Sequence, residues 1–467
     1  MLLALLLGLV FPAALRTGEG GTPAALAFCV MALAGARLGR LVATGEPRLM
    51  EFSFWTFVYV FLGLPALIQF QTATFPAVAP WFDHNLSDDA MWATLIGSSA
   101  AFVGVWLATG LPVADRSMSA RPINEGRAYL LAVGALMANL YYLARVGPAS
   151  LLLSRQELVE VKAAIWPDIE TGMAALMLAA CTLPLLVAFI GLLRVNRQRT
   201  ARGEPRRYLL LILVGCAVVY SINPISSPRY HTGTVLLSMA AAMGAYATAW
   251  RARISALAFI FGLIFLFPVA DAFRRPGGAN WQFDPWFALT TGDFNSATQT
   301  INSLTFINDN GIAWGQQLLG VPLFWVPRHV WPEKPDATGV VIAEYMGYPY
   351  TNDSSPLISE LLINGGWPLM IIGMLVVGWW VRRRDDYFIQ RHRLGERPAE
   401  FGWILPFYLI ILLRGSLLSA ALHFAVMWVA ARFVIGRSGA AGMAPPRQRR
   451  SHASATDVAT SSGGRRP

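Results

Sequence analysis

Charged residues are scarce in this sequence. Asp, Glu, Lys and Arg make up only 14% of its 467 residues, against about 25% in a typical soluble domain. Hydrophobic residues make up 55%, and the mean hydropathy is +0.48. This balance excludes an ordinary soluble globular protein and predicts a multi-pass membrane protein.

Cysteine is also scarce. The three cysteines, Cys29, Cys181 and Cys216, each lie inside an apolar run, where a thiol behaves as a small hydrophobic group. They predict neither a disulfide framework nor a zinc site. The sequence also lacks a Gly-x-x-x-x-Gly-Lys phosphate loop and a Gly-x-Ser-x-Gly elbow, so nucleotide hydrolysis and serine-esterase chemistry have no support. We predict no metal and no cofactor.

The formal net charge of +10 would suggest nucleic-acid binding in a soluble protein. Here the basic residues border the hydrophobic runs, so their positions reflect membrane orientation and we exclude nucleic acid as a partner.

The apolar runs predict an all-α fold of about twelve transmembrane helices. Nine helices occupy residues 1–270, a long extracytoplasmic loop occupies 271–366, three helices occupy 367–436, and a disordered basic cytoplasmic tail occupies 437–467. The first run follows Met1 without a basic segment, so we expect it to be retained as a span. The predicted spans are 2–16, 24–42, 52–70, 91–111, 128–144, 172–193, 208–222, 232–250, 254–270, 367–381, and 401–434 divided at Arg414-Gly415.

Basic residues set the predicted orientation. With both termini in the cytoplasm, 27 of the 37 Lys and Arg residues lie on the cytoplasmic side, as the positive-inside rule requires. Ten remain outside: Arg16, Arg145, Arg155, Lys162, Arg229, Arg274, Arg275, Arg328, Lys334 and Arg414. Any one of them could extend to lipid headgroups or pair with an outer carboxylate. Because guanidinium binds phosphate through two parallel hydrogen bonds, several arginines together indicate a lipid-linked diphosphate.

The segment 320–336 is the most distinctive part of the long loop. It contains Pro322, Pro327, Pro332 and Pro335, which remove backbone donors and exclude a spanning helix. The same segment holds Arg328, His329, Trp331 and Lys334. We therefore predict that chemistry is concentrated in this loop. A second segment, 150–166, has apolar residues at helical spacing and predicts an interfacial helix.

Two runs carry a resemblance to a known family. Val-Pro-Arg-His-Val-Trp-Pro-Glu-Lys-Pro (326–335) is followed by Ser-Ser-Pro-Leu-Ile-Ser-Glu-Leu-Leu-Ile-Asn-Gly-Gly (354–366), and Pro-Arg-Tyr (228–230) and Phe-Arg (273–274) precede them. With the predicted topology, this order resembles the oligosaccharide repeat-unit polymerases, the O-antigen or capsule polymerases of bacterial envelopes. The Arg-x15-Gly spacing of some members does not fit at Arg229, Arg274, Arg275 or Arg328, which leaves the role of each arginine open.

The resemblance implies a glycosyltransferase-C-like membrane fold and a reaction at the outer leaflet of the bacterial cytoplasmic membrane. A glycan on undecaprenyl diphosphate would be transferred to the next lipid-linked repeat unit, and membrane lipids, a chain-length regulator and a flippase would be further partners. Arg328, Lys334, Arg229, Arg274 and Arg275, with Arg414 as a weaker candidate, would neutralise the diphosphate. Glu360 would act as the base, with His329 as its rival, and Trp331 would stack on sugar.

Two other classes of protein remain as alternatives. An O-antigen ligase or another lipid-linked-sugar transferase would use the same outer chemistry with a different acceptor. A polysaccharide flippase or transporter is the third possibility, but such carriers usually have internal repeats, and this sequence shows no convincing repeat.

Overall fold

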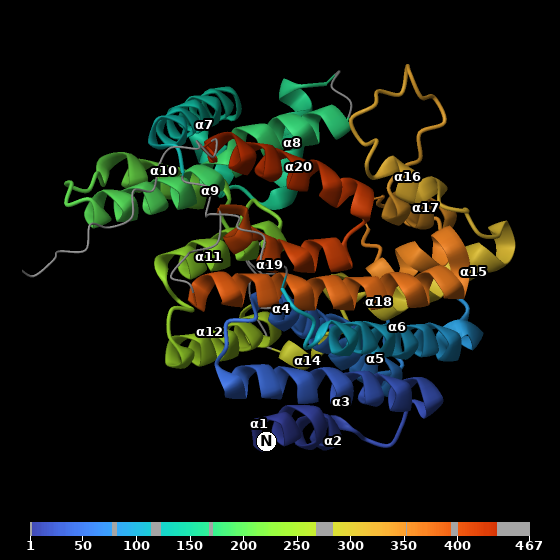
Figure 1. Ribbon diagram of the computed structural model, residues 1–467. Coiled ribbons are helices and arrows are strands. Elements are labelled where there is room, and N and C mark those ends of the chain that lie inside the picture. The colour runs from blue at the N-terminus through green and yellow to red at the C-terminus, as the bar shows by residue number, and fades with distance from the viewer. Residues whose placement is uncertain are drawn as a thin grey trace, which may run out of the picture. The chain divides into compact units, whose positions relative to one another are not determined.

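The computed structural model describes residues 2–76, 82–113, 123–167, 171–267, 284–351, 353–393 and 400–436. Within these ranges the regular structure is helical, apart from an isolated bridge between Ile123 and Ile435. The predicted all-α membrane architecture is confirmed at this level (Figure 1). The predicted disorder of 437–467 lies outside the described residues.

The described helices follow the predicted apolar runs closely. The N-terminal part contains α1 (Leu2–Leu5), η1 (Leu6–Val10), α2 (Phe11–Leu15), α3 (Gly21–Thr44), α4 (Leu49–Phe57), η2 (Val58–Gly63), α5 (Leu64–Thr72), η3 (His84–Leu86) and α6 (Ser87–Ala108). The middle part contains α7 (Glu125–Val146), η4 (Pro148–Leu152), α8 (Arg155–Ile165), α9 (Thr171–Ala201), α10 (Leu209–Ser221), α11 (Arg229–Met243), α12 (Ala249–Phe261) and η5 (Gly262–Leu266). The C-terminal part contains α14 (Pro285–Ala288), η6 (Gly292–Phe294), α15 (Ser296–Asn310), α16 (Gln316–Gly320), α17 (Thr338–Tyr345), α18 (Leu357–Arg393), α19 (Glu400–Arg414) and α20 (Leu417–Val434).

Eight helices in the described ranges are long and apolar enough to cross a membrane. Three shorter apolar helices, Leu2–Leu15, Leu209–Ser221 and Phe401–Arg414, coincide with further predicted spans. The predicted run 232–250 corresponds to α11, which belongs to neither group. The total of twelve spans therefore stays a prediction, whereas the predicted break at Arg414-Gly415 is confirmed because α19 ends at Arg414 and α20 begins at Leu417.

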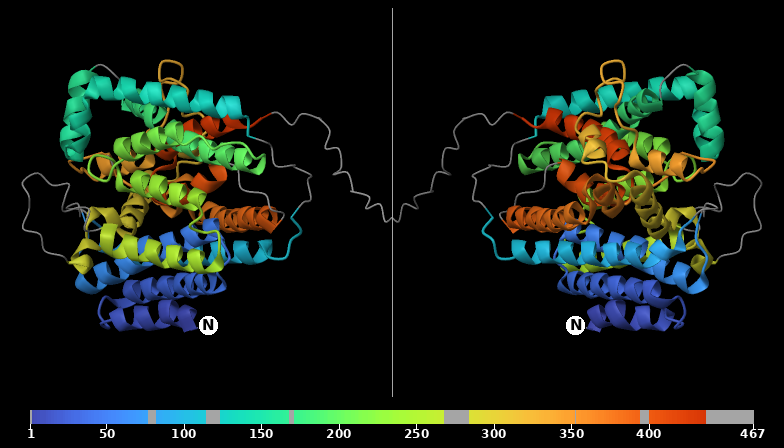
Figure 2. Two further views of the ribbon diagram at one scale, coloured as in Figure 1. Left: turned by 90° about the vertical axis from the view of Figure 1, so that its left-hand side faces the viewer. Right: turned by 90° about the vertical axis from the view of Figure 1, so that its right-hand side faces the viewer.

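Two hydrophobic cores hold the helices together. One joins α3 to α6 with α12, α15 and α18, and the other joins α7, α9, α10, α11 and α20. Helix α19 contributes to both, through Leu409 and Leu413 in the first core and Ile404 and Tyr408 in the second. Figure 2 shows the helices as a stack that runs from α1–α3 at the bottom to α7 at the top. The C-terminal end of α19 is therefore fixed from both sides.

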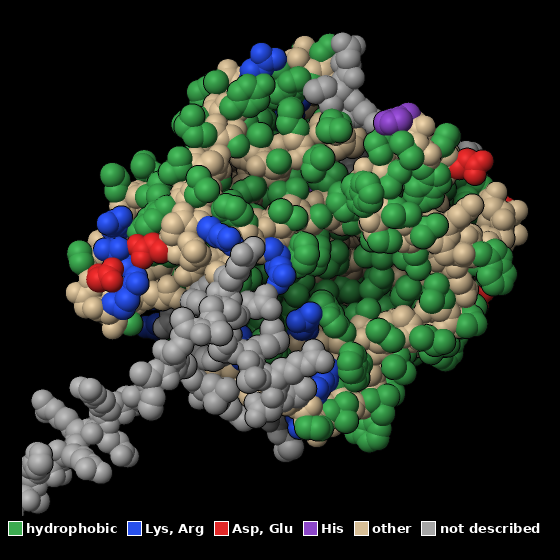
Figure 3. All heavy atoms as spheres, turned by 45° about the horizontal axis from the view of Figure 1, so that its top comes forward, with side chains coloured by type: hydrophobic (Ala, Val, Ile, Leu, Met, Phe, Trp, Pro, Cys, Tyr) green, Lys and Arg blue, Asp and Glu red, His purple; other side chains and the backbone are tan. Residues whose placement is uncertain are grey.

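The surface agrees with a membrane environment. Hydrophobic side chains are spread over much of the face in Figure 3, and most of the Lys and Arg side chains on this face lie to the left and centre. In Figure 1 the right-hand side carries α15, α16 and α17, which come from the predicted outer loop. The segment 150–166 is largely helical, as predicted, with a capping box at Ser154 and Glu157 that begins α8.

The predicted outer loop contains more helix than the sequence indicates. Helix α15 is buried along Ser296–Leu304 although most of these residues are polar, and it packs against α18 and α6. Three of its hydroxyl groups are satisfied locally, as when Ser303 Oγ donates to the Gln299 carbonyl at 2.7 Å. The buried hydroxyls of Ser296 and Thr298 have no hydrogen-bond partner among the described residues. Helix α18 begins at Leu357, ten residues before the predicted start of its span at Trp367, and is kinked at Gly365 and Gly366.

Candidate functional site

Arg229 occupies the N-terminus of α11, directly after Pro228. Its side chain is only 6% exposed and forms an ion pair with the Asp293 carboxylate. The guanidinium also donates to the Phe267 carbonyl at 2.8 Å and lies 4.6 Å from the centroid of the Phe267 ring. The outer end of α11 is thereby attached to η6, which the chain reaches more than sixty residues later.

Arg414 reaches the same point from the C-terminus of α19. It donates through Nη2 to the Asp293 carbonyl at 3.0 Å and through Nε at 3.2 Å. Its guanidinium lies 4.5 Å from the centroid of Tyr230, whose hydroxyl donates to the Asp293 carbonyl at 3.1 Å. The Asp293 carboxylate therefore binds Arg229, and the Asp293 backbone carbonyl binds Arg414. Because a backbone carbonyl is neutral, the two guanidinium groups and the Asp293 carboxylate together carry one net positive charge when all three are ionised.

A half-buried carboxylate, that of Asp353, lies in the same region. It accepts hydrogen bonds from Asn295 Nδ2 and the Ser354 amide, both at 2.7 Å, and from Gln299. Burial raises the pKa of Asp353 above its usual value, although these donors and the charge of Arg414 oppose the shift. Sequence reasoning missed both Asp293 and Asp353, whose only signal is that each is an acidic residue in the predicted outer loop.

Glu360 positions the turn between α19 and α20. Its carboxylate accepts from the Leu417 amide at 3.1 Å and from Thr338 Oγ1 at 2.7 Å, and the residue is 2% exposed. Ser416 Oγ accepts from the Gly339 amide at 2.8 Å in the same turn. The turn that carries Arg414 is thus held by the N-terminus of α17 and by the first part of α18.

The kink of α18 has its own partners in the loop. Gly366 has φ 63°, a left-handed conformation that favours glycine. The carbonyls of Ile363 and Asn364 accept from the amides of Ala313 and Gly315 at 2.8 and 2.9 Å. The backbone groups that a helix break would leave unpaired are therefore satisfied by a segment fifty residues earlier. In the motif Ser-Glu-Leu-Leu-Ile-Asn-Gly-Gly, the first residues thus form a helical segment and the two glycines form its break. The carbonyls of Ile363 and Asn364 attach it to the loop.

The segment after α16 projects as a loop beyond α16 and α17 (Figure 1). Arg328 donates to the Lys334 carbonyl at 3.0 Å and pairs with Asp336. Lys334 Nζ donates to the carbonyls of Phe324 and Val326 at 2.6 and 3.0 Å. These contacts close the loop on itself. His329 is exposed and Trp331 is half-buried.

The structure therefore divides the predicted site residues into groups. Arg229 and Arg414 meet at Asp293. Glu360 lies at the other end of the turn that begins with Arg414. The other four residues lie on the projecting loop: Arg328, His329, Trp331 and Lys334. Arg274 and Arg275 lie outside the described residues. Among the residues that are described, no group of three or more His, Cys, Asp or Glu side chains could hold a metal ion.

No family model, curated protein or solved structure matches this chain. The resemblance to the oligosaccharide repeat-unit polymerases accordingly stays a prediction that rests on the motifs of the sequence.

Proposed function

We propose that this chain is a glycosyltransferase that polymerises undecaprenyl-diphosphate-linked repeat units at the outer leaflet of the bacterial cytoplasmic membrane, with both termini in the cytoplasm. The observation that supports it is the meeting of Arg229 and Arg414 at Asp293. The sequence indicates each arginine separately, because the predicted orientation gives no reason for a basic residue at either position. Two converging guanidinium groups suit a diphosphate, which needs several charge-assisted hydrogen bonds as it leaves.

In this proposal Asp293 holds the two guanidinium groups next to each other before substrate binds. The diphosphate would share or replace the contact between Arg229 and the Asp293 carboxylate, which is 25% exposed. Arg414 would keep its cation–π contact with Tyr230 while its remaining donors turn to phosphate. The two arginines bind the leaving group, which lowers the energy of the transition state more than that of the ground state as negative charge develops.

The base that activates the acceptor hydroxyl is one of the two residues predicted from the sequence. Glu360 is buried between Thr338 and Leu417, which also gives it a positioning role toward Arg414. His329 is exposed on the projecting loop, where it is accessible to an acceptor glycan. The same loop offers Arg328, Lys334 and Trp331 as further contacts for the sugars.

Deletion of the gene tests this function. Cells that lack the chain should lose long glycan chains and retain single repeat units that are accessible from outside the cytoplasmic membrane, as displayed by a glycan ladder on a gel. Accumulation of repeat units on the cytoplasmic leaflet would instead identify a flippase. Accumulation of long chains on the carrier lipid would identify a ligase.

Point variants expressed in the deletion strain show whether Glu360 or His329 is the base. If Glu360 is the base, Glu360→Gln should abolish elongation at normal protein abundance, whereas His329→Ala should elongate normally. The reverse result assigns the base to His329. Loss of protein in Glu360→Gln would indicate that its contacts with Thr338 and Leu417 are needed for folding.

A further inference from the structure

A cavity of about 320 Å³ lies at the opposite end of the helices from α15–α17. It is formed by the ends of α3 and α6, the linker before α4, and the C-terminal part of α18. The sequence predicts that this end faces the cytoplasm. Its lining includes four arginines and two aromatic residues: Arg37, Arg40, Arg48, Arg382, Phe102 and Trp106. We call this cavity the basic pocket.

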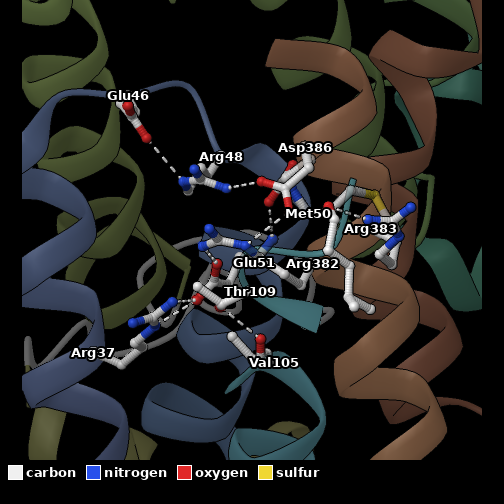
Figure 4. A network of polar contacts seen from close by, with 12 residues as sticks. Arg37, Glu46, Arg48, Met50, Glu51, Val105, Thr109, Arg382, Arg383 and Asp386 are labelled. Carbon is white, nitrogen blue, oxygen red and sulfur yellow. Dashed lines mark hydrogen bonds and ion pairs between the residues drawn. The ribbon is translucent and has the colours of Figure 1, made fainter. Parts of the chain in front are cut away.

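Carboxylates hold three of its arginines in place (Figure 4). Arg37 and Arg382 both pair with Glu51, which is fully buried. Arg48 pairs with Asp386 at 2.7 Å, and Arg382 Nε donates to the same carboxylate at 3.1 Å. Helices α3, α4 and α18 are thereby joined, and the guanidinium groups have fixed positions around the pocket.

These contacts leave hydrogen-bond donors available. A guanidinium has five N–H donors, and the contacts of Arg48 and Arg382 with carboxylates use Nε and Nη1 in each case, so Nη2 remains. Arg40 is exposed and, among the described residues, has neither an ion pair nor a side-chain hydrogen bond. Several donors can therefore reach one anion in the pocket.

Three carboxylates, those of Glu46, Glu51 and Asp386, pair with arginines of the lining. Among the described residues, Glu46 is the only carboxylate that lines the pocket itself. Glu51 and Asp385 are fully buried, and Asp385 accepts from the Met50 and Glu51 amides at 3.0 and 2.8 Å at the N-terminus of α4. The four arginines of the lining thus exceed the three carboxylates paired with them by one positive charge, that of Arg40.

One wall of the pocket is apolar and open. Trp106 is 67% exposed and Phe102 is 37% exposed, and both belong to α6, one of the eight candidate membrane spans. An exposed aromatic residue near the end of a span lies where lipid headgroups meet acyl chains. The basic pocket therefore combines phosphate-binding groups with a surface for hydrocarbon.

We propose that the basic pocket binds the phosphate of an anionic phospholipid, with its acyl chains lying along Phe102 and Trp106. Phosphate recognition by clustered arginines between spanning helices is chemically suited to such lipids. Free inorganic phosphate offers the same anion, but it would not use the apolar wall. The lipid site is separate from the proposed glycan site and does not depend on the proposed function.

Native mass spectrometry of the purified full chain tests the proposal. Titration with phosphatidylglycerol should give a saturable first binding event, and phosphatidylcholine of the same chain length should bind much more weakly. Arg40→Gln removes one charged donor without breaking an internal ion pair, so it should fold normally and raise the Kd for phosphatidylglycerol about tenfold.

Arg145→Gln is the matched control, because Arg145 is exposed on the last turn of α7 and lies outside the pocket. Its Kd should equal that of the wild type. Equal affinity of Arg40→Gln and wild type, or equal affinity for the two lipids, overturns the proposal. Displacement of the bound lipid by millimolar inorganic phosphate would also overturn it, because the site would then recognise the free anion.

Discussion

At the scale of single residues, Asp293 explains why two distant arginines share one place. Its carboxylate binds Arg229 and its carbonyl binds Arg414, so one residue of the predicted outer loop joins α11 to α19. An aromatic ring lies against each guanidinium, Phe267 for Arg229 and Tyr230 for Arg414, and fixes its orientation. This arrangement distinguishes arginine from lysine, which has neither the planar fork nor the same stacking.

Arg414→Lys tests that distinction. The variant keeps the charge but loses the fork and the contact with Tyr230, so we expect glycan elongation to fall about thirty-fold to a thousand-fold, from the loss of about 2 to 4 kcal/mol of transition-state stabilisation. The measurement is chain length on a glycan gel together with membrane abundance by immunoblot. Arg145→Lys is the control and should elongate normally. Full-length glycan in Arg414→Lys at normal abundance would exclude Arg414 from catalysis.

Asp353 makes a prediction about pH and stability. Burial raises its pKa in the folded protein, so the folded state binds a proton more readily than the unfolded state does. The resulting stabilisation is fully present below the unfolded value of about 3.9 and is lost as the pH rises through the folded value. In detergent, the unfolding temperature of the wild type should therefore decline over this window relative to that of Asp353→Asn. Asp88→Asn, at an exposed position of α6, should keep the wild-type profile. Parallel profiles for wild type and Asp353→Asn would contradict the role of burial.

At the scale of elements, α6 and α18 pack closely against each other in the core that also contains α3 and α15. A Cβ added at Gly378 would lie 1.9 Å from the Ala101 carbonyl oxygen, and one at Gly104 would lie 2.0 Å from that of Leu375. Small residues at both positions let the two backbones approach, as is common between membrane helices. This packing holds the part of α18 after the kink, whereas the part before the kink, which carries Glu360, packs against α15.

Gly378→Leu should separate the two helices. The added side chain has no space against Ala101, so overpacking should cost about 1 to 3 kcal/mol and reduce the monodisperse peak in size-exclusion chromatography. Gly134→Leu is the matched control, because Gly134 lies within α7 and no heavy atom lies within 4 Å of an added Cβ there. Equal peaks for the two variants would show that the α6–α18 contact tolerates a large residue.

At the scale of the whole molecule, the orientation predicted from the sequence assigns the two proposed sites to opposite leaflets. Arg229, Arg414 and the projecting loop belong to segments predicted to lie outside, and the basic pocket lies at the ends predicted to be inside. Both proposals therefore depend on the same topology, although neither depends on the other.

Cysteine labelling measures this topology. In a background that lacks Cys29, Cys181 and Cys216, Glu333→Cys should react in intact cells with a membrane-impermeant thiol reagent, and Ala201→Cys should react only after permeabilisation. Both positions are exposed, so accessibility reports the side of the membrane. Reversed labelling would place the projecting loop in the cytoplasm and would remove the basis of the proposed glycan chemistry.

The sequence by itself determined the helical architecture and much of its division into elements. A run of apolar residues in lipid must satisfy its own backbone hydrogen bonds, so hydrophobic length alone predicts where helices form. The pair Arg414-Gly415 inside the long apolar run 401–434 also predicted the break between α19 and α20 from local sequence alone. Helix α15 was not predicted, because its Ser, Thr, Asn and Gln residues resemble a solvated loop until neighbouring helices bury them.

Tertiary structure alone decided which polar residues meet. Arg229 with Asp293, Arg414 with Asp293, and Ala313 with Ile363 are contacts between segments that are fifty or more residues apart. Composition and spacing identify a charge or a glycine, but they carry no information about the partner that folding places beside it. That choice follows from the packing of α19 between the two cores, which fixes where Arg414 lies and therefore which groups can reach it.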